Sequence, residues 1–309
     1  MQFSVIVPTY NRLELLKRTL ESISLQQFND FETIVVNDGS SDGTHEYLTA
    51  LASEKKIKYL FHENKGPSVS RDEGIRNSSG TYVAFTDDDC VVPPDWLRSF
   101  KAHFDSSPVA GIGGSVRTGD PSNWFAAAND VMQNYLKEAV NAASSAAPGA
   151  TPGMARSNPG SASSAPFFTS NNLAFRRDAL LAVGGYDRRF GMGAEDRDLV
   201  HRVHAKGFDL LYDRRIVVEH FNDSYLSQFV CHQFQFGQGS YLFYHGPGVD
   251  RPSRMPLRTY LGMFFAPFGA FSVVKALGIS CFIVVAQAAV TIGYLSAALT
   301  STPRTQNAA

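Results

Sequence analysis

The sequence predicts an α/β fold in which a mainly parallel sheet is flanked by helices. The first reason is that short apolar runs, typical of strands, alternate with segments whose apolar residues recur at helical spacing. The second is the composition, since 44% hydrophobic and 18% charged residues are typical of a folded globular chain. With 309 residues, the chain is long enough for one large α/β domain or two smaller ones.

The alternation is clearest in the N-terminal third of the chain. Strands are expected at residues 3–7, 31–36, 57–61 and 82–86. The first of them ends at Pro8, which has no backbone amide to continue a ladder. The segments between these strands, starting near residues 12, 44 and 64, are expected to be helices.

Further elements are expected downstream, within a single domain that covers residues 1–250. They are a strand at 167–175, a helix at 195–206 that Gly207 ends, and strands within 210–218. The intervening residues 137–166 are rich in Ala, Ser, Gly and Pro, and we expect them to form a flexible surface loop.

An acidic cluster, Asp87, Asp88 and Asp89, directly follows the strand at 82–86. Three adjacent like charges repel one another, so folding alone gives no reason to place them there. In extended chain Asp87 and Asp89 would lie on the same side, where their oxygens suit Mg²⁺ or Mn²⁺. A solvated acidic turn is the alternative, and the apolar strand before the cluster argues against it.

Polar residues also follow two other strands of the predicted sheet. Pro8, Thr9 and Tyr10 come after the first strand, and Asp38 comes after the second. Ligands of doubly wound sheets bind outside the carboxyl ends of the strands. These residues and the acidic cluster are therefore expected to face one crevice.

Composition also limits the partners and the compartment. A net charge of −1 predicts no nucleic-acid partner, which would require a basic excess. Cys90, Cys231 and Cys281 lie far apart, so we expect a reducing compartment and no structural zinc. Because a strand is expected from residue 3, we expect no signal peptide.

Residues 251–309 differ in character from the rest. Three arginines between residues 251 and 258 precede an apolar segment at 259–274, and residues 276–300 contain no charge. The latter segment exceeds the roughly 20 residues that cross a bilayer as a helix, although a buried helical pair would also explain it. We expect membrane association through residues 259–300 on the cytoplasmic face, as the arginines favour; a cytoplasmic protein is the alternative.

Taken in order, these motifs resemble those of the inverting family 2 glycosyltransferases, which have the GT-A fold. The resemblance covers Val5 to about His245. It is carried by Val5–Arg12, Val35–Thr44, Asn64–Gly66 with Arg71 and Gly74, Phe85–Asp89, Gly184–Asp187 and Glu195–Leu199. One departure is Asp72, where the family often has Asn.

The resemblance implies a nucleotide-diphosphate sugar as donor, an acceptor hydroxyl and a bound Mg²⁺ or Mn²⁺. The donor would be held by Pro8, Thr9, Tyr10, Arg12, Asp38, Arg71, Asp87 and Asp88. The metal would be held by Asp89, with Asp87 and His220 as further ligands. A metal so placed would stabilise the charge of the departing nucleoside diphosphate as a Lewis acid.

The acceptor hydroxyl must lose its proton to a base. Glu195 and Asp196 are the candidates, and the resemblance favours Asp196. Both are expected at a helix start, where the macrodipole keeps a carboxylate ionised. An ordinary capping pair would occupy the same positions.

The most consistent function is metal-assisted transfer of a sugar in cell-envelope, polysaccharide or glycolipid synthesis. The acceptor would be a glycan, a glycolipid or a small molecule. One alternative is a sugar nucleotidyltransferase, which would be expected to have a Gly/Arg/Lys-rich loop after the first strand; residues 8–11 do not form one. Another is a non-catalytic protein of the same fold that binds sugar nucleotides.

Overall fold

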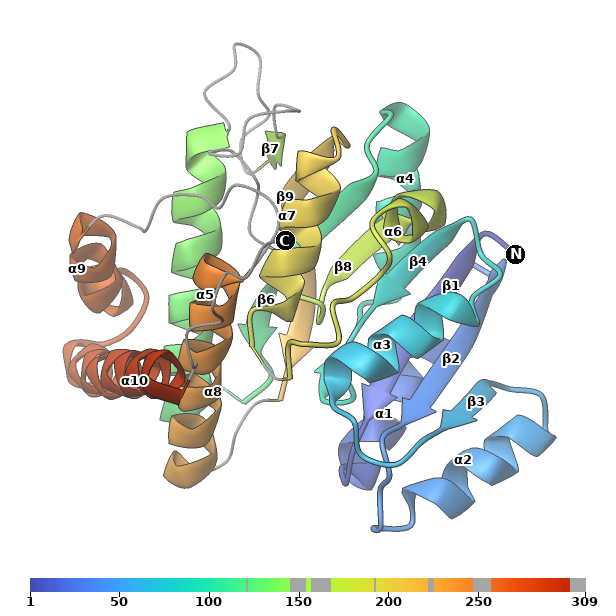
Figure 1. Ribbon diagram of the computed structural model, residues 1–309, viewed down its shortest axis with the longest axis horizontal. Helices are drawn as coiled ribbons and strands as arrows, with labels where there is room; N and C mark the ends of the chain where they lie inside the picture. Colours follow the sequence, from blue (N-terminus) through green and yellow to red (C-terminus); the bar gives the residue numbers. More distant parts are fainter. Residues whose placement is uncertain are drawn as a thin grey trace, which may run out of the picture.

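The computed structural model describes residues 1–120, 122–144, 154–156, 168–191, 193–221, 225–246 and 257–300. In this part of the chain, one nine-stranded sheet carries helices on both faces, and a separate group of helices packs at one end (Figure 1). The predicted α/β class is confirmed.

The strands and helices alternate over most of the chain. The strands are β1 (Phe3–Thr9), β2 (Phe31–Asn37), β3 (Lys58–Phe61), β4 (Tyr82–Phe85), β5 (Cys90–Val91), β6 (Gly111–Thr118), β7 (Met154–Arg156), β8 (Leu173–Arg176) and β9 (Leu210–His220). The helices are α1 (Leu13–Ser24), α2 (Thr44–Ser53), α3 (Pro67–Arg76), α4 (Trp96–Ser106), α5 (Trp124–Ser144), α6 (Arg177–Ala182), α7 (Glu195–Ala205), α8 (Leu226–His245), α9 (Leu257–Phe265), the 3₁₀ helix η2 (Ala266–Gly269) and α10 (Val273–Thr300).

The sheet is parallel in its first half and mixed in its second. Its order is β3-β2-β1-β4-β8-β6-β9-β5, with β7 added on β9. Strands β3, β2, β1 and β4 are parallel to one another, whereas β8 runs antiparallel to both β4 and β6. The carboxyl ends of β1, β2 and β4 therefore meet at one edge, as expected for a ligand crevice.

Both faces of the sheet are buried, which explains the continuous apolar runs of its parallel strands. Val5 and Val7 of β1 pack with α1 and α4 on one face, while Ile6 packs with α3, α6 and α7 on the other. The alternation follows from the two-residue period of a strand. Helices on both faces thus fix the strand ends that carry the polar residues.

Three predicted boundaries were wrong. The first strand does not end at Pro8 but continues to Thr9. The strand expected at 167–175 begins only at Leu173 and ends at Arg176. The loop expected at 137–166 begins too early, because α5 continues to Ser144, and residues 154–156 form β7. Alanine is the strongest helix former, so the Ala-rich start of this stretch extends the helix. The rest of the predicted loop lies outside the described residues.

The C-terminal helices form a third hydrophobic cluster with α5. Buried residues of α5, α8, α9 and α10 pack together there, including Met132, Phe229 and Ile283. Helices α8 and α10 approach closely, since a Cβ added to Gly237 would lie 2.0 Å from the carbonyl oxygen of Val290. The C-terminal helices are therefore docked on the rest of the molecule along α8.

Phe85 offers a test of the core beneath the strand ends. Its side chain is fully buried at the end of β4, so Phe85→Ala should lower the free energy of unfolding by about 3–5 kcal/mol. Phe61, on β3, is 53% exposed, and Phe61→Ala should change stability by less than about 0.5 kcal/mol. Urea denaturation followed by circular dichroism measures both; equal losses would contradict the assigned core.

Candidate active site

A cavity of about 540 Å³ lies at the carboxyl ends of β1, β2 and β4. All the candidate residues identified in the sequence line it: Pro8, Thr9, Tyr10, Arg12, Asp38, Arg71, Asp87, Asp88, Asp89, Glu195, Asp196 and His220. They come from strand ends and helix starts that are far apart in the chain. The predicted common crevice is therefore present.

Asp38 stabilises the loop that opens α3. Its carboxylate accepts hydrogen bonds from the backbone amides of Lys65 and Gly66, at 2.7 and 2.9 Å. Gly66 adopts a φ of 90°, which a residue with a side chain rarely does. Asp38 therefore shapes the cavity wall where β2 ends.

The three aspartates after β4 form a turn, not an extended segment. The Cys90 amide donates to the Asp87 carbonyl oxygen at 3.2 Å. The expectation that Asp87 and Asp89 point to one side of extended chain was wrong, because the turn directs each carboxylate to its own partners. Asp87 pairs with Arg71, with an Oδ1–Nη2 distance of 2.7 Å.

Asp88 and Asp89 share the guanidinium of Arg12. Arg12 Nη1 lies 3.3 Å from Asp88 Oδ1 and 2.6 Å from Asp89 Oδ2. Thr9 also donates to Asp88 at 2.8 Å. Burial raises the pKa of Asp88 to about 7, a rise that Arg12 only partly offsets. Burial opposes ionisation of Asp89 as well, but His220 and Arg12 outweigh it and hold the pKa of Asp89 well below its ordinary value.

Asp89 and His220 form the group best suited to a divalent cation. His220 Nε2 lies 3.1 Å from Asp89 Oδ1, and both residues are buried against the cavity. Burial would lower the pKa of His220, but the Asp89 charge raises it to about 9, which shows how strongly this position favours a positive charge. The carboxylate oxygens of Asp89 suit Mn²⁺ or Mg²⁺.

Two other residues beside this pair are less suitable ligands. Cys90 completes a group of possible ligand atoms within 4.8 Å of one another. Burial raises the pKa of its thiol well above the ordinary value, so it stays protonated and is a poor ligand for a hard cation. Asp87 is not brought into this group, because its carboxylate pairs with Arg71.

Arg71 connects the acidic turn to the start of α7. It is 5% exposed, and its Nη1 lies 3.1 Å from Glu195 Oε1, while Nη2 binds Asp87. The alternative of a surface ion pair was wrong. The position lines the cavity, and the guanidinium is already held by two carboxylates.

Glu195 and Asp196 begin α7 at the cavity, as predicted. Both Glu195 oxygens have partners, Arg71 and the Gly193 amide, the latter at 2.7 Å. Asp196 Oδ2 accepts from the Ser170 amide at 2.9 Å, whereas within the described part of the chain Oδ1 has only a long contact of 3.4 Å with the Tyr186 hydroxyl. Of the four carboxylate oxygens of Glu195 and Asp196, Oδ1 of Asp196 is thus the least engaged.

The electrostatics of this pair differ from the sequence-based expectation. Burial, assisted by the charge of Asp196, raises the pKa of Glu195 to about 7, and burial also raises the pKa of Asp196. The helix start was expected to keep both ionised, but desolvation is the larger effect. A carboxylate with a raised pKa is a better proton acceptor near neutral pH.

Sequence reasoning missed the wall contributed by α5 and α8. Its residues are Asn129, Gln133, His232, Gln233 and Phe236. Asn129 and Gln133 are four residues apart, so they share one face of an otherwise Ala-rich helix. That spacing was a usable signal, although only the fold shows which cavity the face adjoins.

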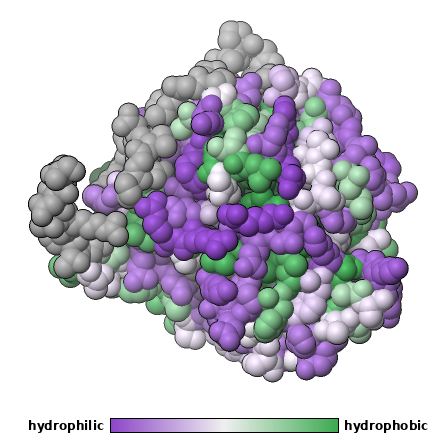
Figure 2. Space-filling model, turned by 45° about the vertical axis from the view of Figure 1, so that its right-hand side comes forward, coloured by the Kyte–Doolittle hydropathy of each residue, from purple (hydrophilic) through white to green (hydrophobic). Residues whose placement is uncertain are grey.

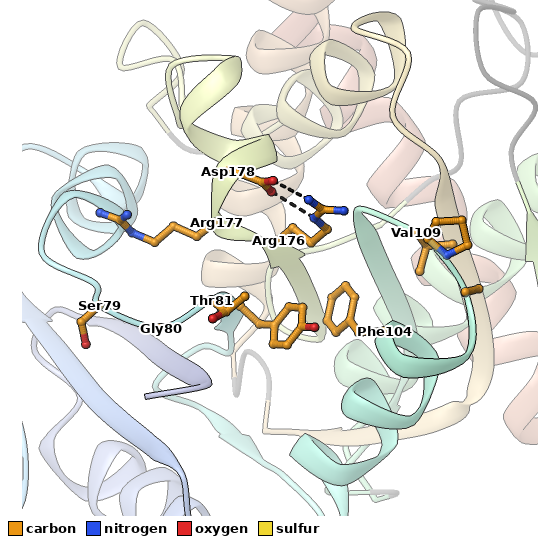
Figure 3. Close-up of a pocket in the computed structure, with 11 residues that line it drawn as sticks. Ser79, Gly80, Thr81, Phe104, Val109, Arg176, Arg177 and Asp178 are labelled. Atoms are coloured by element: carbon orange, nitrogen blue, oxygen red, sulfur yellow. Dashed lines mark hydrogen bonds and ion pairs between the residues drawn. The ribbon is translucent and has the colours of Figure 1, made fainter.

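A second cavity, of about 450 Å³, lies at the opposite edge of the sheet, where β4 begins (Figure 3). Arg176 is held there by Asp178, with an Nη2–Oδ2 distance of 2.5 Å, and Arg177 donates to Ser78 at 3.0 Å. Both cations are engaged by neighbouring side chains, and the cavity lacks the convergent carboxylates of the first. It is not the candidate site.

Comparison with known sequences relates the chain to one family. The sequence model of glycosyl transferase family 2 matches residues 4–184. Validoxylamine A glucosyltransferase of Streptomyces hygroscopicus subsp. jinggangensis (strain 5008) is 31% identical over 229 residues, which cover 68% of this chain and 53% of that protein. The chain therefore spans about half the length of this relative.

A shorter match comes from GalNAc(5)-diNAcBac-PP-undecaprenol beta-1,3-glucosyltransferase of Campylobacter jejuni, 42% identical over 91 residues, or 28% of this chain and 29% of that protein. Among solved structures, the mannosyltransferase PcManGT of Pyrobaculum calidifontis, in complex with GDP-Man and Mn²⁺, has a TM-score of 0.60 at 17% identity and covers 93% of this chain and 86% of its own. TarS of S. aureus, residues 1–349, gives 0.55 at 17% identity, over 96% and 90%. These likenesses confirm the fold.

Proposed function

Since the chain belongs to glycosyl transferase family 2 and has the GT-A fold, we propose that it moves a sugar from a nucleotide-diphosphate sugar to an acceptor hydroxyl with inversion. The observation that carries the proposal is the single cavity that holds both a cation-binding pair, Asp89 and His220, and a carboxylate pair, Glu195 and Asp196. The family match favours this transfer over the nucleotidyltransferase alternative.

The donor would lie along the ends of β1 and β2. Pro8, Thr9, Tyr10 and Asp38 would line the nucleoside, and Tyr10, which is 45% exposed at the cavity, is available to contact a base. Asp89 and His220 would hold Mn²⁺ or Mg²⁺ at the diphosphate, where the ion supplies Lewis-acid stabilisation of the leaving group. Mn²⁺ and GDP-Man are present in the complex of the mannosyltransferase PcManGT, whose fold is similar.

Asp196 is the proposed base. Among the described residues, Oδ1 of Asp196 is the least engaged of the four carboxylate oxygens of Glu195 and Asp196. Burial raises the pKa of Asp196, so this carboxylate can accept the proton of the acceptor hydroxyl. Glu195 would keep Arg71 and the Gly193 loop in place. Arg71 in turn fixes Asp87, so the base and the acidic turn keep their relative positions.

The direct test is release of nucleoside diphosphate from a panel of nucleotide-diphosphate sugars, with and without Mn²⁺. We expect metal-dependent release with at least one donor, together with a metal-dependent rise in melting temperature with the matching nucleoside diphosphate. Absence of both responses with every donor would reject the proposed function and favour a non-catalytic protein.

We also propose that the protein binds the surface of a membrane through its C-terminal helices. One described helix, α10, is long and apolar enough to cross a bilayer. However, one face of α10 is buried against α8 and α5, and both of these helices contribute polar residues to the cavity. The opposite face is apolar and exposed, as Leu299, at 87%, illustrates. With one face held by the protein and the other exposed, we propose that α10 lies on the membrane surface and does not span it.

The exposed apolar face of α10 is unlike the face of the molecule in Figure 2, which is mainly hydrophilic with small apolar areas. On the tail, by contrast, exposed apolar side chains recur over α9, η2 and α10: Leu257, Leu261, Phe265, Phe268, Val273, Val274, Leu277, Val284, Ile292, Leu295 and Leu299. Exposed apolar surface of this extent is typical of an interaction site. A protein held at the membrane by these helices would reach a glycolipid or envelope glycan acceptor most directly.

Co-sedimentation with anionic phospholipid vesicles tests this proposal. We expect the protein to bind, and the double variant Leu277→Glu/Leu295→Glu to lower the partition coefficient by about 10²-fold or more, because each leucine contributes about 1.5–3 kcal/mol when buried. Leu181→Glu, at a 49% exposed leucine on α6, is the matched control and should bind as the wild type does. Equal binding of all three proteins would refute membrane docking by α10.

A further inference from the structure

The wall of the cavity formed by α5 and α8 has a chemistry of its own. Three amide side chains, Asn129 and Gln133 of α5 and Gln233 of α8, line it together with Phe236. We call these three residues the amide wall. None of them belongs to the strand ends or to α7, which hold the proposed donor site and base.

The hydrogen bonds of the amide wall are incomplete. Gln233 Nε2 donates to Asn129 Oδ1 at 3.3 Å, and both side chains are more than nine-tenths buried. Among the described residues, nothing else bonds to the Asn129 amide nitrogen or the Gln233 carbonyl oxygen, and the buried Gln133 Oε1 has no partner. Buried polar groups are normally paired, so these atoms are suited to a ligand.

The amide wall is also uncharged. The two guanidinium groups that line the cavity, those of Arg12 and Arg71, are each held by two carboxylates. The amide side chains themselves therefore offer an anionic group no opposite charge, although His232 of α8 also lines the cavity. Sugar hydroxyls, by contrast, both donate and accept, and they match a wall that offers both amide NH2 groups and carbonyl oxygens. Phe236 adds an apolar surface for the C–H face of a sugar ring.

We propose that the amide wall is an acceptor subsite that binds an uncharged sugar residue and presents its hydroxyl to Asp196. This inference rests on the proposed function and names the acceptor class. In the transfer step, the hydroxyl oxygen forms the new bond to the anomeric carbon, and its proton passes to Asp196. The bond from the anomeric carbon to the diphosphate breaks, and its electron pair leaves with the nucleoside diphosphate.

The test compares acceptors in the metal-loaded wild type. Methyl glycosides of glucose, galactose, mannose and N-acetylglucosamine are the neutral probes; methyl glucuronide and glucose 6-phosphate are the anionic ones. We expect at least one neutral glycoside to form a glycosylated product, and the anionic probes to be poor acceptors. Transfer to the anionic probes alone would overturn the inference, as would donor hydrolysis without transfer to any neutral glycoside.

A variant pair then locates the subsite. Asn129→Ala/Gln233→Ala should raise the acceptor KM by roughly 10²-fold, since each lost hydrogen bond to an uncharged group contributes up to about tenfold. Gln235→Ala, on α8 but outside the cavity lining, is the matched control and should keep the wild-type KM.

These readouts separate the two proposals. An equal KM in the double variant and the control overturns the subsite while leaving metal-dependent donor hydrolysis, and with it the proposed function, intact. Failure of the wild type to release nucleoside diphosphate from any donor instead rejects the proposed function. Saturation-transfer NMR of the neutral glycosides with wild-type protein needs no variant; absence of any signal at high millimolar concentration also overturns the subsite.

Discussion

Replacement of Asp196 by Asn is expected to lower kcat for sugar transfer by about 10²–10⁴-fold, the usual contribution of a general base. The amide keeps the size of the side chain and can still accept the hydrogen bond of the Ser170 amide, so the start of α7 should stay in place. Donor affinity should be unchanged, because Asp196 acts on the acceptor. Initial rates and calorimetric donor titration measure the two quantities.

Two controls accompany this variant. Asp105→Asn makes the same chemical change at an exposed position of α4 and should leave transfer unaffected. Glu195→Gln should cost less than Asp196→Asn, since Glu195 is engaged by Arg71 and the Gly193 amide. Normal transfer by Asp196→Asn, or a larger loss in Glu195→Gln, would refute the assignment of the base.

The pH profile of the wild type provides a further readout of this prediction. The base must be deprotonated, so kcat/KM is lost as pH falls through the pKa of the folded protein. Burial raises the pKa of Asp196 above its ordinary value and that of Glu195 to about 7. The acidic limb should therefore lie well above pH 4, and because the two carboxylates interact, it reports on the pair. A limb near the ordinary aspartate pKa of about 3.9 would contradict the buried site.

Replacement of Asp89 by Asn is expected to remove metal-dependent donor binding and to lower kcat by about 10²–10³-fold, as loss of electrostatic stabilisation of a leaving group does. Asp89 is the carboxylate closest to His220, and its low pKa keeps it charged and able to bind a cation. The Mn²⁺-dependent rise in melting temperature with nucleoside diphosphate should disappear. That binding readout does not depend on turnover.

The neighbouring Asp88 supplies the matched control. Burial raises the pKa of Asp88 to about 7, whereas the pKa of Asp89 is lowered, so Asp88→Asn should remove less charge than Asp89→Asn. The amide can still accept the hydrogen bond of Thr9. We expect a smaller loss of kcat and a retained Mn²⁺ response. The opposite order of effects would assign the metal to Asp88 instead.

The predicted membrane-associated tail and the two candidate bases, Glu195 and Asp196, show where one sequence pattern allows more than one structure. The charge-free stretch at 276–300 predicted a helix, which α10 confirms, but its composition is the same whether it spans, docks or is buried. Only packing shows that Gly237 and Val290 bring α8 and α10 together along one face. Similarly, the position of Glu195 at a helix start was predicted correctly, whereas its raised pKa depends on burial that local sequence does not encode.

The sequence by itself determined the alternation of strands and helices, the presence of an acidic cluster after β4 and the order of the motifs. These follow from local periodicity and turn chemistry, which each segment carries alone. The tertiary structure decided which carboxylates meet which cations, so that Asp87 faces Arg71 while Asp89 faces His220. It also brought Asn129 and Gln233 together, because contacts between segments about a hundred residues apart in the chain depend on how the helices pack on the sheet.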